Sequence, residues 1–189
     1  MGILAQNGAL SLRTMEGTES DLRIFLQWMT DPQTMKYWDG MTMIYDYDMV
    51  QQHYREHVEE GVHSCFIQCE GEPVGYLQFY TIPDAEAAEV PEEDYARFVK
   101  AEECVYGIDL FIGRVELRGK GLGTQLLKMV CAMLFEQYGA DHILIDPKSH
   151  NARAIRCYEK VGFRHYVTVP QRELQDGIYH DSCIMGLRK

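Results

Sequence analysis

Residues 105–124 read VYGIDLFIGRVELRGKGLGT, and the change of character inside this segment decides the fold. Val105–Ile112 is a nearly continuous apolar run, which is typical of a strand covered on both faces. It leads into a glycine-rich loop, after which apolar residues at helical spacing predict a helix over Leu122–Phe135. A buried strand, a glycine loop and a helix in succession indicate an α/β domain.

The loop itself reads Arg118-Gly119-Lys120-Gly121-Leu122-Gly123-Thr124, a composition that suits an anion site. Closely spaced glycines let the backbone approach a ligand and point successive N–H groups at it. The start of the following helix adds a partial positive charge, so we expect the loop to hold a pyrophosphate, although a plain turn would look similar. A P-loop is excluded because the Gly-Lys-Ser/Thr ending is missing, and Leu126 stands where a dinucleotide fingerprint has its third glycine.

The segments on either side of this unit alternate between strand and helix patterns. Strands are expected at Ala9–Met15, Ser64–Cys69, Val74–Tyr80, His142–Ile145, Phe163–Val169 and His180–Leu187. Further helices are expected at Glu19–Met29, 46–58 and Ala152–Val161. The acidic stretch Pro83–Lys100 reads as an exposed excursion. The pattern predicts one mixed central sheet flanked by helices, in a single domain spanning residues 1–189.

The charge balance excludes one class of function. Lys and Arg number 18 against 29 Asp and Glu, which gives a formal net charge of −11. Phosphate repels such a protein, so we expect no nucleic-acid partner, whereas a cationic ligand would suit it. Plain solubility is the simpler explanation of the charge by itself.

Targeting and metal signals are missing from the sequence. No apolar run reaches the roughly 20 residues that span a bilayer, and the N-terminal residues do not read as a secretory signal. The six cysteines are scattered without a C-x-x-C pair, which argues against a disulfide framework and a zinc site. We therefore expect a cytoplasmic protein with no membrane attachment and no metal.

Two motifs carry a family resemblance. Arg118-x-x-Gly121-x-Gly123 resembles the Arg/Gln-x-x-Gly-x-Gly/Ala signature that GCN5-related N-acetyltransferases use for the pyrophosphate of coenzyme A. Asn151-x-Arg153-Ala154-Ile155-Arg156-x-Tyr158-Glu159-Lys160-x-Gly162-Phe163 is similar to the second coenzyme segment of that superfamily. The resemblance covers about Leu12 to Leu187, and it implies a sheet that opens at its middle strands to admit the pantetheine arm. It also implies acetyl coenzyme A as cosubstrate, with these contacts: Arg118, Gly119, Lys120, Gly121, Leu122, Gly123, Thr124 and Asn151.

A narrower resemblance points to the aminoglycoside 6'-N-acetyltransferases. Val105–Gly113, Gly119–Thr124 and Asp146-Pro147 look like the matching segments of those enzymes, and Tyr37-Trp38-Asp39-Gly40 falls where they carry an early substrate loop. The implied function is acetylation of the 6'-amine of an aminoglycoside, and thus antibiotic resistance. Implied drug contacts are Trp38, Asp39 and Asp146. Asp84–Lys100 does not align residue by residue, so the drug range is open, as is the choice between monomer and homodimer.

Asp109 and Tyr158 are the predicted catalytic residues. Asp109 is the one carboxylate in Val105–Ile112, and a carboxylate in a buried strand is costly unless it is paired or functional. Aliphatic amines are mostly protonated at neutral pH, so their acetylation needs a proton acceptor, and we predict Asp109 as this base or as the amine anchor. The resemblance implies that Tyr158 protonates the leaving thiolate.

Each of these residues also has a purely structural interpretation. Asp109 could be satisfied by neighbouring groups, Tyr158 could be a packed helix aromatic, and Trp38 could belong to the core. Asp146 could equally be a turn residue before Pro147.

Two other functions fit the same motifs. The chain could acetylate a different amine, such as a siderophore precursor, a polyamine or a protein N-terminus. It could also be a coenzyme A-binding module without catalysis, although the presence of both Asp109 and Tyr158 counts against this.

Overall fold

The computed structural model describes residues 2–189, and within them eight strands form one mixed sheet in the order β1-β2-β3-β4-β5-β6-β8-β7. Neighbouring strands are antiparallel except β5 and β6, which are parallel. The strands are β1 (Ile3–Asn7), β2 (Leu10–Thr14), β3 (His63–Cys69), β4 (Glu72–Thr81), β5 (Val105–Ile112), β6 (His142–Ile145), β7 (Arg164–Gln175) and β8 (Ile178–Arg188). The helices are α1 (Glu19–Met29), α2 (Pro32–Met35), α3 (Tyr47–Glu59), α4 (Glu92–Phe98), α5 (Leu122–Gln137) and α6 (Ala152–Val161), with a 3-10 turn at Val115–Leu117. The predicted fold class is confirmed.

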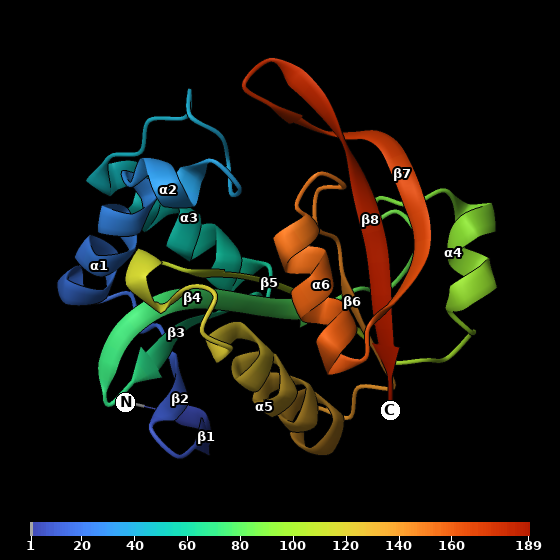
Figure 1. Cartoon of the computed structure of the whole chain (residues 1–189), viewed down its shortest axis with the longest axis horizontal. Coiled ribbons are helices and arrows are strands. Elements are labelled where there is room, and N and C mark those ends of the chain that lie inside the picture. Colours follow the sequence, from blue (N-terminus) through green and yellow to red (C-terminus); the bar gives the residue numbers. More distant parts are fainter. Residues whose placement is uncertain (1) are drawn as a thin grey trace.

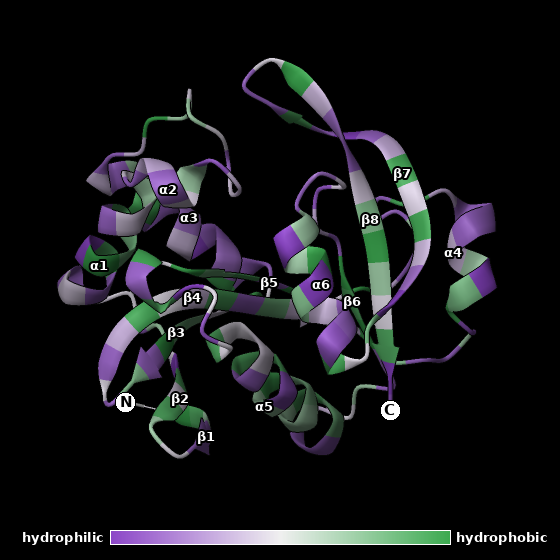
Figure 2. Ribbon diagram, viewed as in Figure 1, coloured by the Kyte–Doolittle hydropathy of each residue, from purple (hydrophilic) through white to green (hydrophobic). Residues whose placement is uncertain are grey.

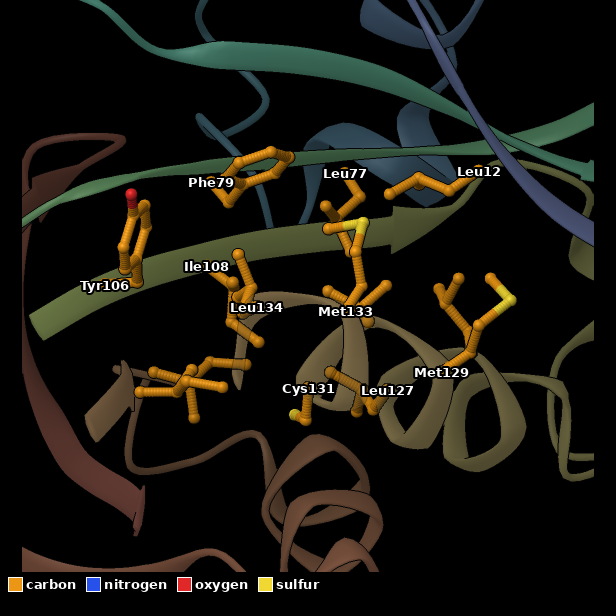
Figure 3. Close-up of a cluster of buried hydrophobic side chains, with 14 of the residues drawn as sticks. Leu12, Leu77, Phe79, Tyr106, Ile108, Leu127, Met129, Cys131, Met133 and Leu134 are labelled. Atoms are coloured by element: carbon orange, nitrogen blue, oxygen red, sulfur yellow. The ribbon is translucent and has the colours of Figure 1, made fainter. Parts of the chain in front are cut away.

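Helices cover both faces of the sheet, because side chains alternate along each strand. Helices α1, α2 and α3 lie on one face and α5 lies on the other (Figure 1). Tyr76 of β4 belongs to the cluster under α1–α3, whereas Leu77 and Phe79 belong to the cluster under α5. Figure 3 shows this second cluster, in which Leu127 and Leu134 of α5 meet the sheet. The side chains of Leu77, Phe79, Leu127 and Leu134 are completely buried.

Local capping explains where the helices begin and end. The Thr18 side chain accepts a hydrogen bond from the Asp21 amide and caps α1. Asn151 caps α6 in the same way, and this helix ends at Gly162, whose φ of 118° suits glycine. Helix α5 begins differently, because its N-cap is Gly121 and no side chain caps it. The first N–H groups of α5 are therefore left for other partners.

The sheet opens between its two parallel strands. β5 and β6 pair at Val105–Gly107 with His142–Leu144, and the ladder goes no further. Within residues 2–189, the later half of β5 therefore has no strand partner on the β6 side. β4 continues to pair on the other side as far as Ile112. The opening that the family resemblance implied is thus present, and Asp109 lies where it starts.

The C-terminal hairpin is longer than predicted. We expected strands that end at Val169 and begin again at His180, but β7 and β8 continue to a tight turn at Asp176-Gly177. Both turn residues have positive φ, 53° and 77°, which a two-residue hairpin turn requires. Between Val169 and Glu173 the register shifts, so three residues bulge out of β7. The alternation of apolar and polar residues is interrupted at this bulge, which explains why the predicted strands are too short.

Two smaller differences concern the edges of the fold. The first predicted strand, Ala9–Met15, is β2 and is slightly shorter, and it pairs with an unpredicted edge strand, β1. The excursion between β4 and β5 carries α4 and packs as a third apolar cluster on β6, β7 and β8. No helix in residues 2–189 has the length and apolar character needed to cross a lipid bilayer.

Candidate active site

A cavity of about 670 Å³ lies where the sheet opens. Its lining comes from β5, the end of β6, the Gly119–Gly123 loop, α6, the turn after α2, and the bulge of β7. Sites of this size and position are typical of small-molecule ligands. The cavity brings together segments that are far apart in the sequence, including predicted catalytic, coenzyme and substrate residues.

The cavity has charges of opposite sign at different places along its wall. Arg118 and the α6 side chains Arg153, Arg156 and Lys160 make the part near the glycine loop basic. Five acidic residues come from β5, β7, the end of β6 and two loops: Asp39, Glu89, Asp109, Asp146 and Glu173. Only Lys148 and Arg172 stand among these acidic residues in the described lining. The cavity therefore has a basic end and an acidic end.

The glycine loop exposes backbone at the basic end. Gly119 and Gly121 have φ values of 76° and 86°, and a Cβ added at either would meet no atom within 4 Å. Gly123 lies closer to α6, since its Cβ would be 3.4 Å from the Cys157 sulfur. Thr124 also lines the cavity, where its hydroxyl is 3.4 Å from the same sulfur. Of the other predicted loop contacts, Lys120 and Leu122 are not part of the lining.

Arg118 holds the loop to the rest of the protein. Its Nε donates to the Ile112 carbonyl at 2.7 Å, and its Nη1 and Nη2 donate to the Gln33 carbonyl and the Thr34 hydroxyl. Burial and the charge of Arg153 lower the pKa of this guanidinium. Asn151 lines the cavity as well, although its side-chain oxygen accepts the Ala154 amide.

Asp109 lies at the junction of the two ends. Its Oδ2 accepts a hydrogen bond of 2.9 Å from Nε2 of Gln78, its register partner on β4. Tyr80 also bonds to this carboxyl. Burial, and then the nearby charge of Asp146, raise its pKa from 3.8 to about 7, against the opposing effects of Gln78, Tyr80 and Arg172. A carboxyl with this pKa can take up and release a proton at neutral pH.

Asp146 is neutralised by a neighbour that the sequence did not reveal. Its Oδ2 accepts a short hydrogen bond from Nη1 of Arg172, which lies in the β7 bulge. The same guanidinium donates to the carbonyls of Ala88 and Glu89 and pairs with the Glu89 carboxylate at 3.2 Å. Asp146 thus faces the cavity as half of an ion pair.

The turn after α2 forms the opposite wall. Trp38 is partly buried and packs edge-on against Tyr76 and Phe111, so it belongs partly to the core and partly to the cavity. Asp39 is exposed and accepts a short hydrogen bond from the Tyr45 hydroxyl. Burial and this contact raise the pKa of Tyr45.

The hairpin reaches this wall from the other side. Asp176 at the hairpin tip accepts hydrogen bonds from the amides of Met41 and Thr42 at 2.8 and 2.7 Å. The β7–β8 hairpin thus extends toward the loop that follows α2 (Figure 1). Figure 2 shows that this projecting tip carries hydrophobic residues, and Leu174 and Ile178 are more than half exposed there, at 61% and 62%.

Tyr158 of α6 is buried and lines the cavity. Burial is the main reason why its pKa is raised, followed by the negative charge that Cys157, Asp109 and Asp146 would add nearby. Within residues 2–189 no hydrogen bond of its hydroxyl is observed, so this neutral phenol is available to a ligand.

Several site residues escaped the sequence analysis. Gln78, Tyr80, Lys148, Arg172 and Glu173 all face the cavity. Tyr76, Gln78 and Tyr80 carry polar groups at alternate positions of β4, which was a possible signal for Gln78. The bulge that turns Arg172 inward has no such signature, because bulge positions are not marked by a regular pattern.

Comparison with known proteins gives concordant results. A family model described as an acetyltransferase (GNAT) domain matches residues 17–170. The aminoglycoside N(6')-acetyltransferase type 1 of Klebsiella pneumoniae is 33% identical over 165 residues, which cover 86% of this chain and 78% of that protein.

Solved structures agree with this relationship. The aminoglycoside acetyltransferase AAC(6')-Ib in complex with ribostamycin and coenzyme A matches with a TM-score of 0.75 at 29% identity, over 96% of this chain and 94% of that one. The spermidine N-acetyltransferase of Vibrio cholerae, in complex with coenzyme A and spermine, matches with a TM-score of 0.74 at 18% identity, over 96% of both chains. This second likeness concerns the fold alone.

Proposed function

The chain belongs to the acetyltransferase (GNAT) family, and we propose that it transfers the acetyl group of acetyl coenzyme A to the 6'-amine of an aminoglycoside. The observation that carries the proposal is the position of Asp109, a carboxylate where β5 and β6 separate, between the basic and acidic ends of one cavity. The relative from Klebsiella pneumoniae, an aminoglycoside N(6')-acetyltransferase, supports the choice of substrate.

The basic end fits the phosphates of the coenzyme. Gly119 and Gly121 leave open space beside their backbone, and the uncapped start of α5 supplies N–H donors at the same place. Arg153, Arg156 and Lys160 are exposed on the facing helix and add positive charge. In this proposal Arg118 positions the loop through its bonds to backbone carbonyls, and Gly123 allows close approach of α5 and α6.

Asp109 is the proposed proton acceptor. When bound, acetyl coenzyme A would supply the acetyl thioester that a neutral amine attacks. The substrate amine arrives mostly as an ammonium ion, and the acidic end attracts it. Because the pKa of Asp109 is raised to about 7, its carboxylate can accept the ammonium proton at neutral pH without binding it permanently.

Tyr158 is the proposed proton donor. Its raised pKa keeps the phenol protonated, and its hydroxyl has no partner in the described protein. The residue can therefore hold a proton at its Oη for the thiolate that leaves, while Asp109 holds the proton taken from the amine. The two residues stand on different elements, β5 and α6, on either side of the opening.

The acidic end is the proposed site for the rest of the drug. Asp39, Glu89 and Glu173 can attract the several ammonium groups of an aminoglycoside, and Trp38 offers an aromatic face to a sugar ring. We also propose the cytoplasm as the place of action.

The test measures release of free coenzyme A thiol with kanamycin, spermidine and a lysine peptide in parallel. The proposal expects rapid release with kanamycin, acetylated at the 6'-amine, and weak release with the other two. Release with spermidine or the peptide only would leave the family intact and overturn the aminoglycoside assignment. Coenzyme binding without release on any amine would favour a non-catalytic module.

A further inference from the structure

A line of hydrogen bonds leads from the Asp109 carboxylate into the protein interior. Gln78 donates to Asp109, and its Oε1 lies 3.1 Å from the Tyr76 hydroxyl. This hydroxyl lies 2.8 Å from Oγ of Ser64, which in turn lies 3.0 Å from Nδ1 of His57. The line connects the cavity with α3 on the covered face of the sheet.

The ladder of the sheet explains why these groups meet. Gln78 is the register partner of Asp109 on β5 and of Ser64 on β3. Tyr76 precedes Gln78 on the same face of β4, because side chains alternate along a strand. His57 comes from α3, which packs over this face. Three adjacent strands and one helix thus contribute to a single line.

The donors next to Asp109 have one consistent direction. A carboxylate can only accept, so the Gln78 amide group must point its NH2 at Asp109 and its carbonyl at Tyr76. The Tyr76 hydroxyl is placed to donate to Oε1 of Gln78 and to Oγ of Ser64. Nδ1 of His57 lies 3.0 Å from this Oγ and 3.5 Å from the Tyr76 hydroxyl, so it contacts both groups. The line therefore fixes which end of the Gln78 amide faces Asp109.

Burial keeps the side chains of this line in place. Tyr76, Ser64 and His57 are buried, with exposed fractions of 1%, 6% and 8%. Burial, and then the neighbouring His53, lower the pKa of His57 to about 4, while Glu56 opposes this shift. His57 is therefore neutral at neutral pH and carries one ring proton.

We infer that Gln78, Tyr76, Ser64 and His57 are positioning residues, which hold the Asp109 carboxylate in one orientation and supply a donor that favours its ionised form. The inference rests on the proposed function, in which Asp109 accepts the amine proton. Without an ordered donor from Gln78, burial and Asp146 would oppose ionisation of Asp109 with less compensation. The other groups facing Asp109 are Tyr80, Arg172 and Tyr158.

The sharpest variant is Tyr76→Phe, because it removes one hydroxyl and keeps the ring that packs on Phe25 and Phe111. We expect kcat/KM for kanamycin to fall about tenfold, mainly through kcat, since one buried hydrogen bond is lost. The acid limb of the pH profile should move to higher pH. Tyr95→Phe is the matched control, because the buried Tyr95 hydroxyl has no hydrogen-bond partner in residues 2–189.

A double-mutant cycle separates this role from general destabilisation. If Tyr76 acts through Gln78, the variant Tyr76→Phe/Gln78→Leu should be no slower than Gln78→Leu alone. Additive losses, or a lower rate with an unmoved acid limb, would overturn the inference.

A second measurement does not depend on activity. Ring-nitrogen NMR should show one predominant tautomer of His57, and Ser64→Ala should shift the balance between the two tautomers. The carboxyl carbon of Asp109 should titrate at higher pH in Tyr76→Phe than in the wild type. If both hold while no amine is acetylated, the proposed function fails and the positioning network stands. A His57 signal that Ser64→Ala does not move, together with an unchanged Asp109 titration, would refute the network.

Discussion

Arg172 and Asp146 form an ion pair inside the cavity, although one lies in the bulge of β7 and the other directly follows β6. The side chain of Arg172 is only 10% exposed. Arg172 already pairs with the Asp146 carboxylate. Asp146 therefore competes less with Asp109 for the ammonium group of an incoming substrate. The pair also ties the bulge to the excursion between β4 and β5, through the carbonyls of Ala88 and Glu89.

The first prediction concerns this pair. Arg172→Gln should lower the free energy of unfolding by about 3 kcal/mol, since it leaves a partly buried carboxylate without its partner. It should also move the acid limb of the kcat/KM profile to higher pH, because Arg172 lowers the pKa of Asp109. Urea unfolding and a pH–rate series measure the two effects.

Arg97→Gln is the control for that experiment. Arg97 pairs with Asp94 on α4, but its side chain is 71% exposed. Its loss should change stability by less than about 1 kcal/mol. Equal effects of the two variants would mean that the Arg172 pair has no special role.

The second prediction is the pH dependence of acetylation. The kcat/KM for kanamycin should fall as pH drops below about 7, because protonation of Asp109 removes the base. Asp109→Asn should lower kcat at pH 8 by at least about 100-fold and abolish this limb. Asp48→Asn, an exposed change on α3, should leave both unchanged. An acid limb that persists in Asp109→Asn would assign the base to another group.

The third prediction is that the stability of the protein falls as pH rises through the range in which its activity increases. The pKa of Asp109 is raised from 3.8 to about 7 on folding, so the folded state binds its proton more tightly than the unfolded state. The wild type therefore loses stability as pH rises through this window. Asp109→Asn avoids the loss and should raise the Tm at pH 8 by at least about 2 °C, with a smaller gain at pH 5. Calorimetry at both pH values checks this, and a lower Tm at pH 8 would contradict it.

The fourth prediction concerns Tyr158→Phe. Removal of the phenol should lower kcat by at least about tenfold while the KM for kanamycin changes little, because the proton donor acts after binding. Tyr138→Phe, next to the end of α5, serves as control. A rise in KM with unchanged kcat would make Tyr158 a binding residue only.

The fifth prediction tests the hairpin tip. Asp176→Ala removes the bonds to Met41 and Thr42 and frees the loop after α2. The KM for kanamycin should rise at least about threefold, since the substrate must then order this wall itself. The KM for acetyl coenzyme A, at the other end of the cavity, should stay the same. Parallel changes in both constants would point to a global effect.

Much of the fold could be predicted because its central elements have strong local patterns. β5, β6, α1 and α6 have the bounds that the sequence predicts, since their apolar patterns are strong. The cavity residues Asp109 and Tyr158 were found through a motif and one unusual carboxylate. Each of these signals lies within a short stretch of neighbouring residues, so it can be recognised without knowledge of the fold.

The remaining features depend on contacts between distant segments. Arg172 enters the cavity only because β7 bulges, and Gln78 matters only because the ladder sets it opposite Asp109. The hydrogen bonds of Arg118 to Gln33 and Ile112 likewise depend on how α2 meets the loop. No window of neighbouring residues contains this information.

The short ladder between β5 and β6 has a mechanical consequence. The sheet is two half-sheets, β1–β5 and β6–β8, fastened along a seam at Val105–Gly107 and His142–Leu144. A ligand that lies in the gap and bonds to both half-sheets connects them where they share no hydrogen bonds of their own. Because it binds the folded state, it raises the free energy of unfolding by RT ln(1 + [L]/Kd), and the protein without its ligand is correspondingly less stable.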